Sequence, residues 1–267
     1  MPLLRRYYHI FSAFWQRGLT YRSTIIGYRI GEITELLVII LLWSRIFEGH
    51  TVILGYTKPE MITYFLLGNL FGVAVRSYAR ESISRDISEG GLSAIITKPM
   101  SYLSFLAPRE IGRMSLPTIL SIITNLLVIL PFHALLIDLP NLGIILIIIA
   151  MLALALIIEF LINYLIGFIT FWTEETEAIF DVIGRLKRFF SGYYFPLSLM
   201  PVALITLSGW MPFSYSFFTP AQLYLGKMSI TDGLRGLGIE AAWIVILWLA
   251  VKLMYKRGRK RYEGVNI

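Results

Sequence analysis

The chain has 267 residues, of which 57% are hydrophobic and 15% are charged, whereas an average soluble domain carries about 25% charged residues. The formal net charge is +7 and cysteine is absent, which excludes a disulfide framework, a thiolate metal site and a cysteine nucleophile. Long apolar runs joined by short loops predict a single all-α polytopic membrane domain over residues 1–267.

Residues 1–22 are predicted to contain an amphipathic interfacial helix, whose pattern runs over residues 3–17. Aromatic residues such as Tyr7 and Phe11 fall on one side at helical spacing, and Arg5 and His9 fall on the other. Such a segment is too short and too charged to cross a membrane, but it suits the headgroup layer. The alternative is an ordinary cytoplasmic tail.

The first span is predicted from about residue 24 to residue 47, with three ionisable side chains in its first half. Arg29 can pair with Glu32 on one helix face, and Glu35 follows three residues later. Ionisable groups at membrane depth are costly and usually face protein or water. Glu32 and Glu35 therefore either line a transport route or stabilise packing at the cytoplasmic boundary.

A short polar outer loop, residues 48–59, leads to the second span at about residues 59–78. Gly68 and Gly72 in this span form a small-xxx-small pair, which predicts a close approach of two helices. The next stretch, residues 80–99, is too polar to enter lipid, and its helical period with a double-glycine break predicts a short helix on the cytoplasmic face.

The third span is predicted at about residues 114–136, after a separate segment that re-enters the bilayer at residues 102–108. Pro117 and Pro131 predict kinks in this span. The fourth span, about residues 142–172, is the longest apolar run and exceeds the ~20 residues of a straight crossing, so it is expected to tilt or protrude.

Glu159 and Asn163 lie one turn apart near the middle of the fourth span. A lone acid at mid-membrane indicates a functional site, so Glu159 is a candidate for the translocation pathway. The alternative is a buried hydrogen bond between helices.

The last third of the chain is predicted to contain a broken helix, a final span and a basic tail. Acids followed by bases in residues 173–188 predict the start of a fifth helix. Proline, glycine and aromatic residues interrupt residues 191–225, which predicts a re-entrant helical hairpin at the outer face, the alternative being an exposed aromatic loop. A polar outer loop at 226–238, a sixth span at about 239–254 and a basic cytoplasmic tail at 256–267 complete the chain.

Basic residues gather on one side of this topology. Placing the N-terminus in the cytoplasm leaves only Arg45, Lys58, Lys227 and Arg235 outside, and this asymmetry predicts six transmembrane helices with both ends in the cytoplasm. The basic tail is expected to retain the chain and to attract anionic membrane lipid. Nucleic acid is not an expected partner.

No catalytic or nucleotide-binding motif is present. The sequence lacks G-x-x-x-x-G-K-[ST], H-E-x-x-H and G-x-S-x-G patterns, and His9, His50 and His133 fall on different predicted layers. We therefore expect no enzymatic activity, no metal site and no cofactor in this chain. Energy for uphill transport would come from an ion gradient or from a partner.

The polar segment 80–99 has the composition of a helix that docks on another protein. It offers apolar anchors, charges that set the register, and glycine to end the helix. The candidate docking residues are Ile83, Arg85, Asp86, Ile87, Glu89, Gly90 and Leu92.

Two stretches resemble the permease subunits of ABC-2 type exporters, six-span proteins that work with a separate ATPase. The first has the pattern IxxDIxxGxL followed by KP, and the second has FW near the end of span four followed by SGxxxPLxxxP. The residues concerned are Ile83, Asp86, Ile87, Gly90, Leu92, Lys98 and Pro99, then Phe171, Trp172, Ser191, Gly192, Pro196, Leu197 and Pro201. Ser88 and Glu89 depart from the family, in which a basic residue is common, and this bears on the choice of partner.

The resemblance implies a bacterial cytoplasmic membrane protein in which residues 80–99 form a coupling helix on the ATPase, and the ATPase binds ATP and Mg. A second permease, identical or related, would complete the translocation pathway. Spans one, two and five would line that pathway. The candidate pathway residues are Glu32, Glu35, Glu159, Tyr193, Tyr194 and Phe195.

Three other functions are compatible with parts of the sequence. An ion-coupled carrier would use Glu159, but the internal repeat common in such carriers is not evident. A membrane-embedded lipid-modifying enzyme would need a cluster of catalytic groups that cannot be assembled, and a membrane scaffold would need none. The substrate is left open among a hydrophobic drug, a lipid, a lantibiotic-like peptide and a polysaccharide.

Overall fold

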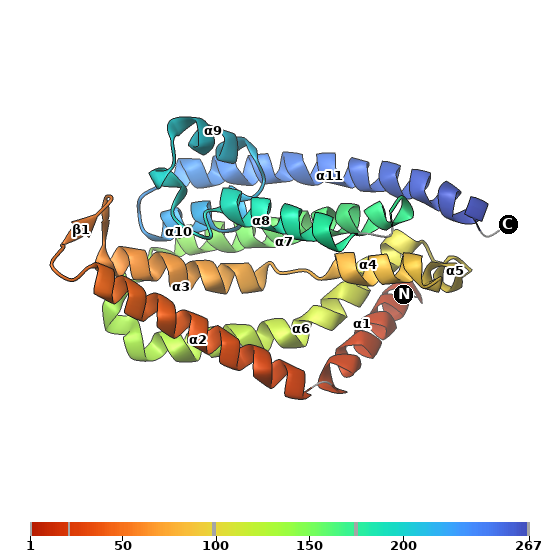
Figure 1. Ribbon diagram of the computed structural model, residues 1–267, viewed down its shortest axis with the longest axis horizontal. Helices are drawn as coiled ribbons and strands as arrows, with labels where there is room; N and C mark the ends of the chain where they lie inside the picture. Colours follow the sequence, from red (N-terminus) through yellow and green to blue (C-terminus); the bar gives the residue numbers. More distant parts are fainter. Residues whose placement is uncertain (1, 21, 98–99, 174–175, 266–267) are drawn as a thin grey trace.

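The computed structural model describes residues 2–20, 22–97, 100–173 and 176–265, and nearly all of its regular structure is helical. The long helices lie roughly along one axis, as Figure 1 shows. One two-stranded hairpin lies at one end of the molecule, and both chain termini lie toward the other end, near α4 and α5. The predicted all-α architecture is confirmed.

The N-terminal helix α1 (Pro2–Thr20) packs against the first half of α6 (Tyr102–Ile129). The two helices approach closely because a glycine lies at their contact: a Cβ at Gly112 would lie 2.4 Å from the backbone oxygen of Phe11. The ring centroids of Phe14 and Phe105 are 6.2 Å apart across the same contact. The predicted amphipathic helix is therefore tied to the rest of the chain along one face.

Helix α2 (Arg22–Ile46) and helix α3 (Lys58–Ala74) are joined by a hairpin in the segment that was predicted as a short polar loop. Its strands, β1 (Val52–Ile53) and β2 (Tyr56–Thr57), pair antiparallel around Gly55, whose φ is +81°. β-Branched and aromatic residues on either side of a glycine turn favour this structure.

The two glycines of α3 do not mediate contact between two helices as predicted. A Cβ at Gly68 would lie 1.8 Å from the ring of Phe217, so Gly68 accommodates an aromatic side chain from a distant, irregular segment. A Cβ at Gly72 would meet nothing within 4 Å. Within this chain, Gly68 therefore makes room for the Phe217 ring, and Gly72 has open space beside it.

The polar segment after α3 contains two short helices, α4 (Ala79–Ser88) and α5 (Gly91–Ile96). Gly90 separates them with a φ of +79°, a left-handed conformation that glycine adopts at little cost. The predicted glycine break is confirmed. Lys98 and Pro99 of the sequence motif lie outside the described residues.

The predicted split in the third span is wrong, because α6 runs without interruption through Pro108 and Pro117. The helix gives way at Leu130 to the 3₁₀ helix η1 (Leu130–Leu135), which contains Pro131. The helix predicted for the fourth span is confirmed as α7 (Leu142–Phe168), continued by η2 (Ile169–Phe171). Asn141 caps α7, since its Oδ1 accepts a hydrogen bond from the Ile144 N–H at 3.0 Å.

Helix α8 (Glu177–Ser191) ends at Gly192, whose φ of +83° turns the chain back. A run of short pieces follows, in agreement with the predicted broken helices. These pieces are η3 (Leu197–Leu199), α9 (Val202–Trp210), η4 (Ser214–Ser216) and α10 (Phe218–Tyr224).

The last helix, α11 (Ile230–Val265), corrects two predictions. It begins inside the predicted outer loop, because Asp232 and Ser229 cap it reciprocally: Asp232 Oδ2 accepts from the Ser229 N–H at 3.0 Å, and Ser229 Oγ accepts from the Asp232 N–H at 3.2 Å. It also continues through most of the predicted basic tail, since lysine and arginine favour helix.

Three helical segments within the described residues are long and apolar enough to cross a membrane: 102–132, 142–171 and 230–262. They correspond to predicted spans three, four and six. Helix α2 has 25 residues but carries Arg29, Glu32 and Glu35. Helices α3 and α8 have 17 and 15 residues, about 26 and 23 Å at 1.5 Å per residue, against a hydrocarbon core of about 30 Å.

Candidate functional site

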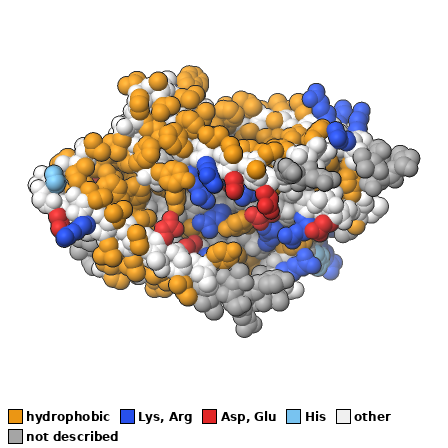
Figure 2. Space-filling view, viewed as in Figure 1, with side chains coloured by type: hydrophobic (Ala, Val, Ile, Leu, Met, Phe, Trp, Pro, Cys, Tyr) orange, Lys and Arg blue, Asp and Glu red, His pale blue; other side chains and the backbone are white. Residues whose placement is uncertain are grey.

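A cavity of about 360 Å³ opens between α2, α3, α7, α8 and the η4 region, and we call it the polar cavity. Figure 2 shows acidic and basic side chains gathered at the middle of this face, near α8 and the carboxyl end of α3, with hydrophobic side chains around them. The lining residues are Glu35, Asn69, Gly72, Val75, Arg76, Glu159, Lys187, Arg188, Ser191, Tyr193, Ser216 and Phe217.

Glu159 is not the lone acid that the sequence predicted. The Lys187 ammonium lies 2.5 Å from its Oε1, and Asn163 Nδ2 donates a hydrogen bond to the same oxygen at 2.9 Å. The side chains of Glu159 and Lys187 are 14% and 29% exposed. The pair therefore links α7 to α8 at the cavity wall. This contact agrees with the alternative prediction for Glu159, a polar contact between helices, and Lys187 is the main partner.

Glu35 and Tyr193 join α2 to the segment after α8. The Tyr193 hydroxyl donates a hydrogen bond to Glu35 Oε1 at 2.6 Å. The Arg188 guanidinium lies 5.9 Å from the centroid of the Tyr193 ring. Arg76, which follows the end of α3, donates to the hydroxyl of Tyr78 at 3.3 Å.

An apolar annex of about 240 Å³ continues from the polar cavity along α2 and α3. The two spaces share the wall residues Glu35, Asn69, Tyr193 and Phe217. The other residues of the annex are Ile39, Leu42, Trp43, Phe65 and Tyr194. The Trp43 and Phe65 rings stack there with centroids 5.3 Å apart.

The structure brings together three of the six predicted pathway residues, namely Glu35, Glu159 and Tyr193. Tyr194 lines the annex only. Phe195 is partly buried instead and packs against Phe189 with ring centroids 5.9 Å apart.

Glu32 lies outside both spaces. It forms the predicted pair with Arg29 at 2.5 Å and accepts a hydrogen bond from Ser121 of α6 at 2.8 Å. Arg29 also donates to Ser121. These contacts favour the packing alternative for Glu32, because they fix α2 to α6.

Sequence reasoning missed the three basic residues of the cavity, Arg76, Lys187 and Arg188. The charge asymmetry used to predict the topology assigned them to the cytoplasmic side. One signal was present: Lys187 and Arg188 come directly before the aromatic segment that was predicted to be re-entrant, and an acid such as Glu159 in a predicted span needs a partner.

The predicted docking residues divide into a buried group and an exposed group. Ile83, Ile87 and Leu92 are 0%, 7% and 0% exposed and belong to a core shared with α6, α7 and α11. A Cβ at Gly167 of α7 would lie 2.8 Å from Ile83 Cβ. The expectation that these apolar side chains anchor a partner is therefore corrected: they anchor α4 and α5 to their own chain.

Asp86 is likewise engaged within the chain. Arg109 Nη1 of α6 lies 2.5 Å from Asp86 Oδ2, and the Tyr102 hydroxyl donates to the same oxygen at 2.7 Å. Next to it, Ser82 donates to Glu110 Oε1 at 2.5 Å, and Glu110 is fully buried. Buried ionic contacts thus clamp α4 onto α6.

Arg85, Glu89 and Gly90 remain exposed. The side chains of Arg85 and Glu89 are 69% and 70% exposed and lie 3.9 Å apart. The surface that α4 presents to its surroundings is therefore a strip of small and charged residues rather than an apolar patch.

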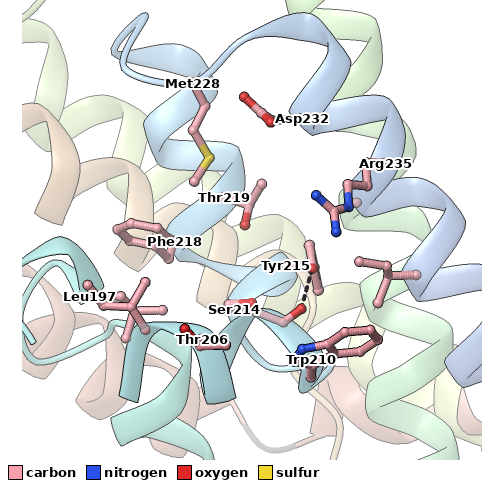
Figure 3. A pocket seen from close by; sticks show the side chains of 14 residues that line it. Leu197, Thr206, Trp210, Ser214, Tyr215, Phe218, Thr219, Met228, Asp232 and Arg235 are labelled. Atoms are coloured by element: carbon pink, nitrogen blue, oxygen red, sulfur yellow. Dashed lines mark hydrogen bonds between the residues drawn. The ribbon is translucent and has the colours of Figure 1, made fainter. Parts of the chain in front are cut away.

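A second cavity of about 290 Å³ lies between α9, η4, α10 and the start of α11. Figure 3 shows Leu197, Phe218 and Met228 around it, with Asp232 and Arg235 on α11. The Tyr215 hydroxyl, in its wall, donates to the Gly209 carbonyl at 2.6 Å. None of the predicted pathway residues lines this space.

No cluster of three or more histidine, cysteine, aspartate or glutamate side chains suited to a metal ion is found in the described part of the chain. Residues 33–265 match the family model described as ABC-2 family transporter protein. No curated protein matches the sequence.

Proposed function

Because this chain belongs to the ABC-2 family of transporter proteins, we propose that it is the transmembrane permease subunit of an ATP-driven exporter. The family is a membrane-embedded transport component and implies an ABC ATPase as partner. ATP and Mg would bind to that ATPase. The exposed strip of α4, together with α5, would be its docking surface.

The observation that carries the proposal is the clamp between α4 and the spanning helix α6. Arg109 and Asp86 are 5% and 18% exposed, so their 2.5 Å contact lies largely out of water, where an ion pair is stronger than at the surface. A helix held in this way cannot shift without moving the start of α6. A displacement of α4 by the ATPase would therefore reach the membrane.

The contact of α4 with α7 supports the same coupling. Ile83 lies directly over Gly167, and Arg80 contributes its backbone oxygen 3.1 Å from the position of a Cβ there. Closely packed interiors transmit displacement because they contain few voids. Helix α7 carries Glu159, so the movement would also reach the polar cavity.

We infer six spans. Three are α6, α7 and α11, which are long and apolar enough to cross a membrane, and the other three are α2, α3 and α8. Helix α2 exposes large apolar side chains along its length, among them Tyr28, Ile30, Val38 and Leu41, which are 54–68% exposed. A second permease or lipid would cover this face. The basic ends of the chain favour the cytoplasmic side for both termini in a bacterial cytoplasmic membrane.

An ion-coupled carrier is not proposed. Its central residue would be Glu159, but this carboxylate already has a lysine partner at 2.5 Å and an amide donor at 2.9 Å. Such a pair connects α7 and α8 without any need for a transported cation.

The docking surface is tested by charge reversal of Arg85→Glu together with Glu89→Arg in the full chain, co-expressed with its ATPase. Since both side chains are mostly exposed, the free energy of unfolding should change by less than about 0.5 kcal/mol. Copurification of the ATPase should fall at least severalfold. The control variant is the charge reversal Arg257→Glu on the exposed part of α11, and it should leave ATPase recovery unchanged. Equal ATPase recovery from the wild type and the double variant would contradict docking through α4.

A further inference from the structure

The charges of the polar cavity do not cancel. Its wall carries the acids Glu35 and Glu159 and the bases Arg76, Lys187 and Arg188, so three positive and two negative formal charges leave one positive charge. Lys187 and Glu159 neutralise one another at 2.5 Å. The remaining carboxylate, Glu35, lines the same cavity as the guanidinium groups of Arg76 and Arg188.

Arg76 and Arg188 are the groups left for a ligand. In the described part of the chain, no ion pair joins either guanidinium to a carboxylate. Arg188 lies against the Tyr193 ring and Arg76 donates to one hydroxyl, which leaves most of their N–H donors available. A net charge facing a membrane interior is costly unless it is compensated.

The space next to these arginines is apolar. The annex shares four wall residues with the polar cavity and is otherwise lined by Ile39, Leu42, Trp43, Phe65 and Tyr194. A molecule that fills both spaces therefore meets cations at one end and aliphatic and aromatic side chains at the other.

We propose that the polar cavity and the annex together bind an amphiphile with one negative charge, its anionic head between Arg76 and Arg188 and its apolar chain in the annex. This inference rests on the proposed function, since the amphiphile would be the transported substrate class. One anion brings the formal charge of the cavity to zero. A neutral drug leaves the positive charge uncompensated, and a cationic peptide has the wrong sign.

The test uses the full chain in phosphatidylcholine nanodiscs and three probes with the same brominated dodecyl chain. Their heads are a sulfate (one negative charge), a maltoside (neutral) and a trimethylammonium (one positive charge). Bromine in the annex would quench the fluorescence of Trp43, and a Trp43→Phe variant identifies that component among the six tryptophans. The sulfate probe should bind at least about 10-fold more tightly than the other two, as expected for charge-assisted hydrogen bonds.

Two substitutions should act in opposite directions. Arg188→Gln removes one of the two cations and should weaken binding of the sulfate probe by roughly 10-fold. Glu35→Gln removes the opposing acid, keeps an acceptor for Tyr193 and should tighten binding severalfold. Arg257→Gln, on the exposed part of α11, is the matched control and should leave binding unchanged. General damage to the fold would weaken binding in both cavity variants, so opposite shifts are specific to the charge argument.

Equal affinity for the three probes, or a shift of the two cavity variants in the same direction, would overturn the inference. Methyl sulfate tests whether an anion suffices: competition as strong as that of the full probe would overturn the amphiphile assignment. ATPase copurification is measured on the same preparations. If the ATPase copurifies but the sulfate probe binds no more tightly than the other two probes, this inference alone is refuted. If the sulfate probe is preferred but no ATPase copurifies, the exporter proposal is refuted and the amphiphile site is supported.

Discussion

The clamp between α4 and α6 can be tested by removing one charge from a buried ion pair. Asp86→Asn keeps the side-chain volume and an acceptor for the Tyr102 hydroxyl, but it leaves the Arg109 guanidinium, 5% exposed, without its closest carboxylate. Breaking a buried pair costs about 3–5 kcal/mol. Because Asp86 is 18% exposed and Glu110 remains 3.6 Å from Arg109, we expect a loss at or just below the lower limit of that range, about 2–3 kcal/mol.

The free energy of unfolding in mixed micelles, followed by tryptophan fluorescence, measures this loss. The control is Glu48→Gln, which breaks the Arg45–Glu48 pair at a similar distance of 2.6 Å but with side chains 79% and 60% exposed. Exposed pairs contribute about 0–1 kcal/mol, so the control variant should remain near wild type. The two ion pairs have similar distances and differ in burial, so the comparison tests the effect of burial.

A double variant completes the cycle. Asp86→Asn with Arg109→Met removes both charges, and its loss should be smaller than the sum of the two single losses by at least about 2 kcal/mol. Additive losses, or equal small effects for Asp86→Asn and Glu48→Gln, would refute the clamp. The result also bears on docking experiments, because Asp86 and the buried Ile87 cannot be altered without affecting the fold.

Two further predictions concern single contacts. Gly68→Ala should destabilise the chain by about 1–3 kcal/mol, as overpacking does, because its Cβ would lie 1.8 Å from the Phe217 ring. In the control variant Gly72→Ala the new Cβ meets nothing within 4 Å, so this change should be nearly neutral. Equal unfolding free energies for the two variants would contradict the packing described. Glu159→Gln with Lys187→Met should leave ATP-driven export in proteoliposomes intact, because the pair is removed as a unit. A pH-dependent flux abolished by this double variant would instead favour an ion-coupled carrier.

The sequence was sufficient to predict elements whose signal is local. Long apolar runs predicted α7, and the double glycine predicted the break between α4 and α5 at Gly90. The capping pair Ser229 and Asp232 was also readable, but the surrounding polar residues led to a predicted loop where α11 begins. Hydropathy alone could not show that a basic tail continues a helix.

The cavity was less predictable because it depends on which sides of five segments meet. Glu35 and Glu159 were selected by the cost of a charge in lipid, and both line the polar cavity. Their partners Tyr193 and Lys187 lie 158 and 28 residues away in the sequence, a pairing that no local pattern encodes. Ile83 was predicted to contact a partner protein because no local pattern showed that it packs against Gly167 of α7.

The most direct test of the exporter proposal is affinity purification of this chain in mild detergent, expressed with its neighbouring genes, followed by ATP hydrolysis with and without vanadate. The account predicts that an ATPase subunit and a second permease copurify, that hydrolysis is vanadate-sensitive, and that the subunit masses show whether the two permeases are identical. A chain that purifies alone and without ATPase activity would contradict the account.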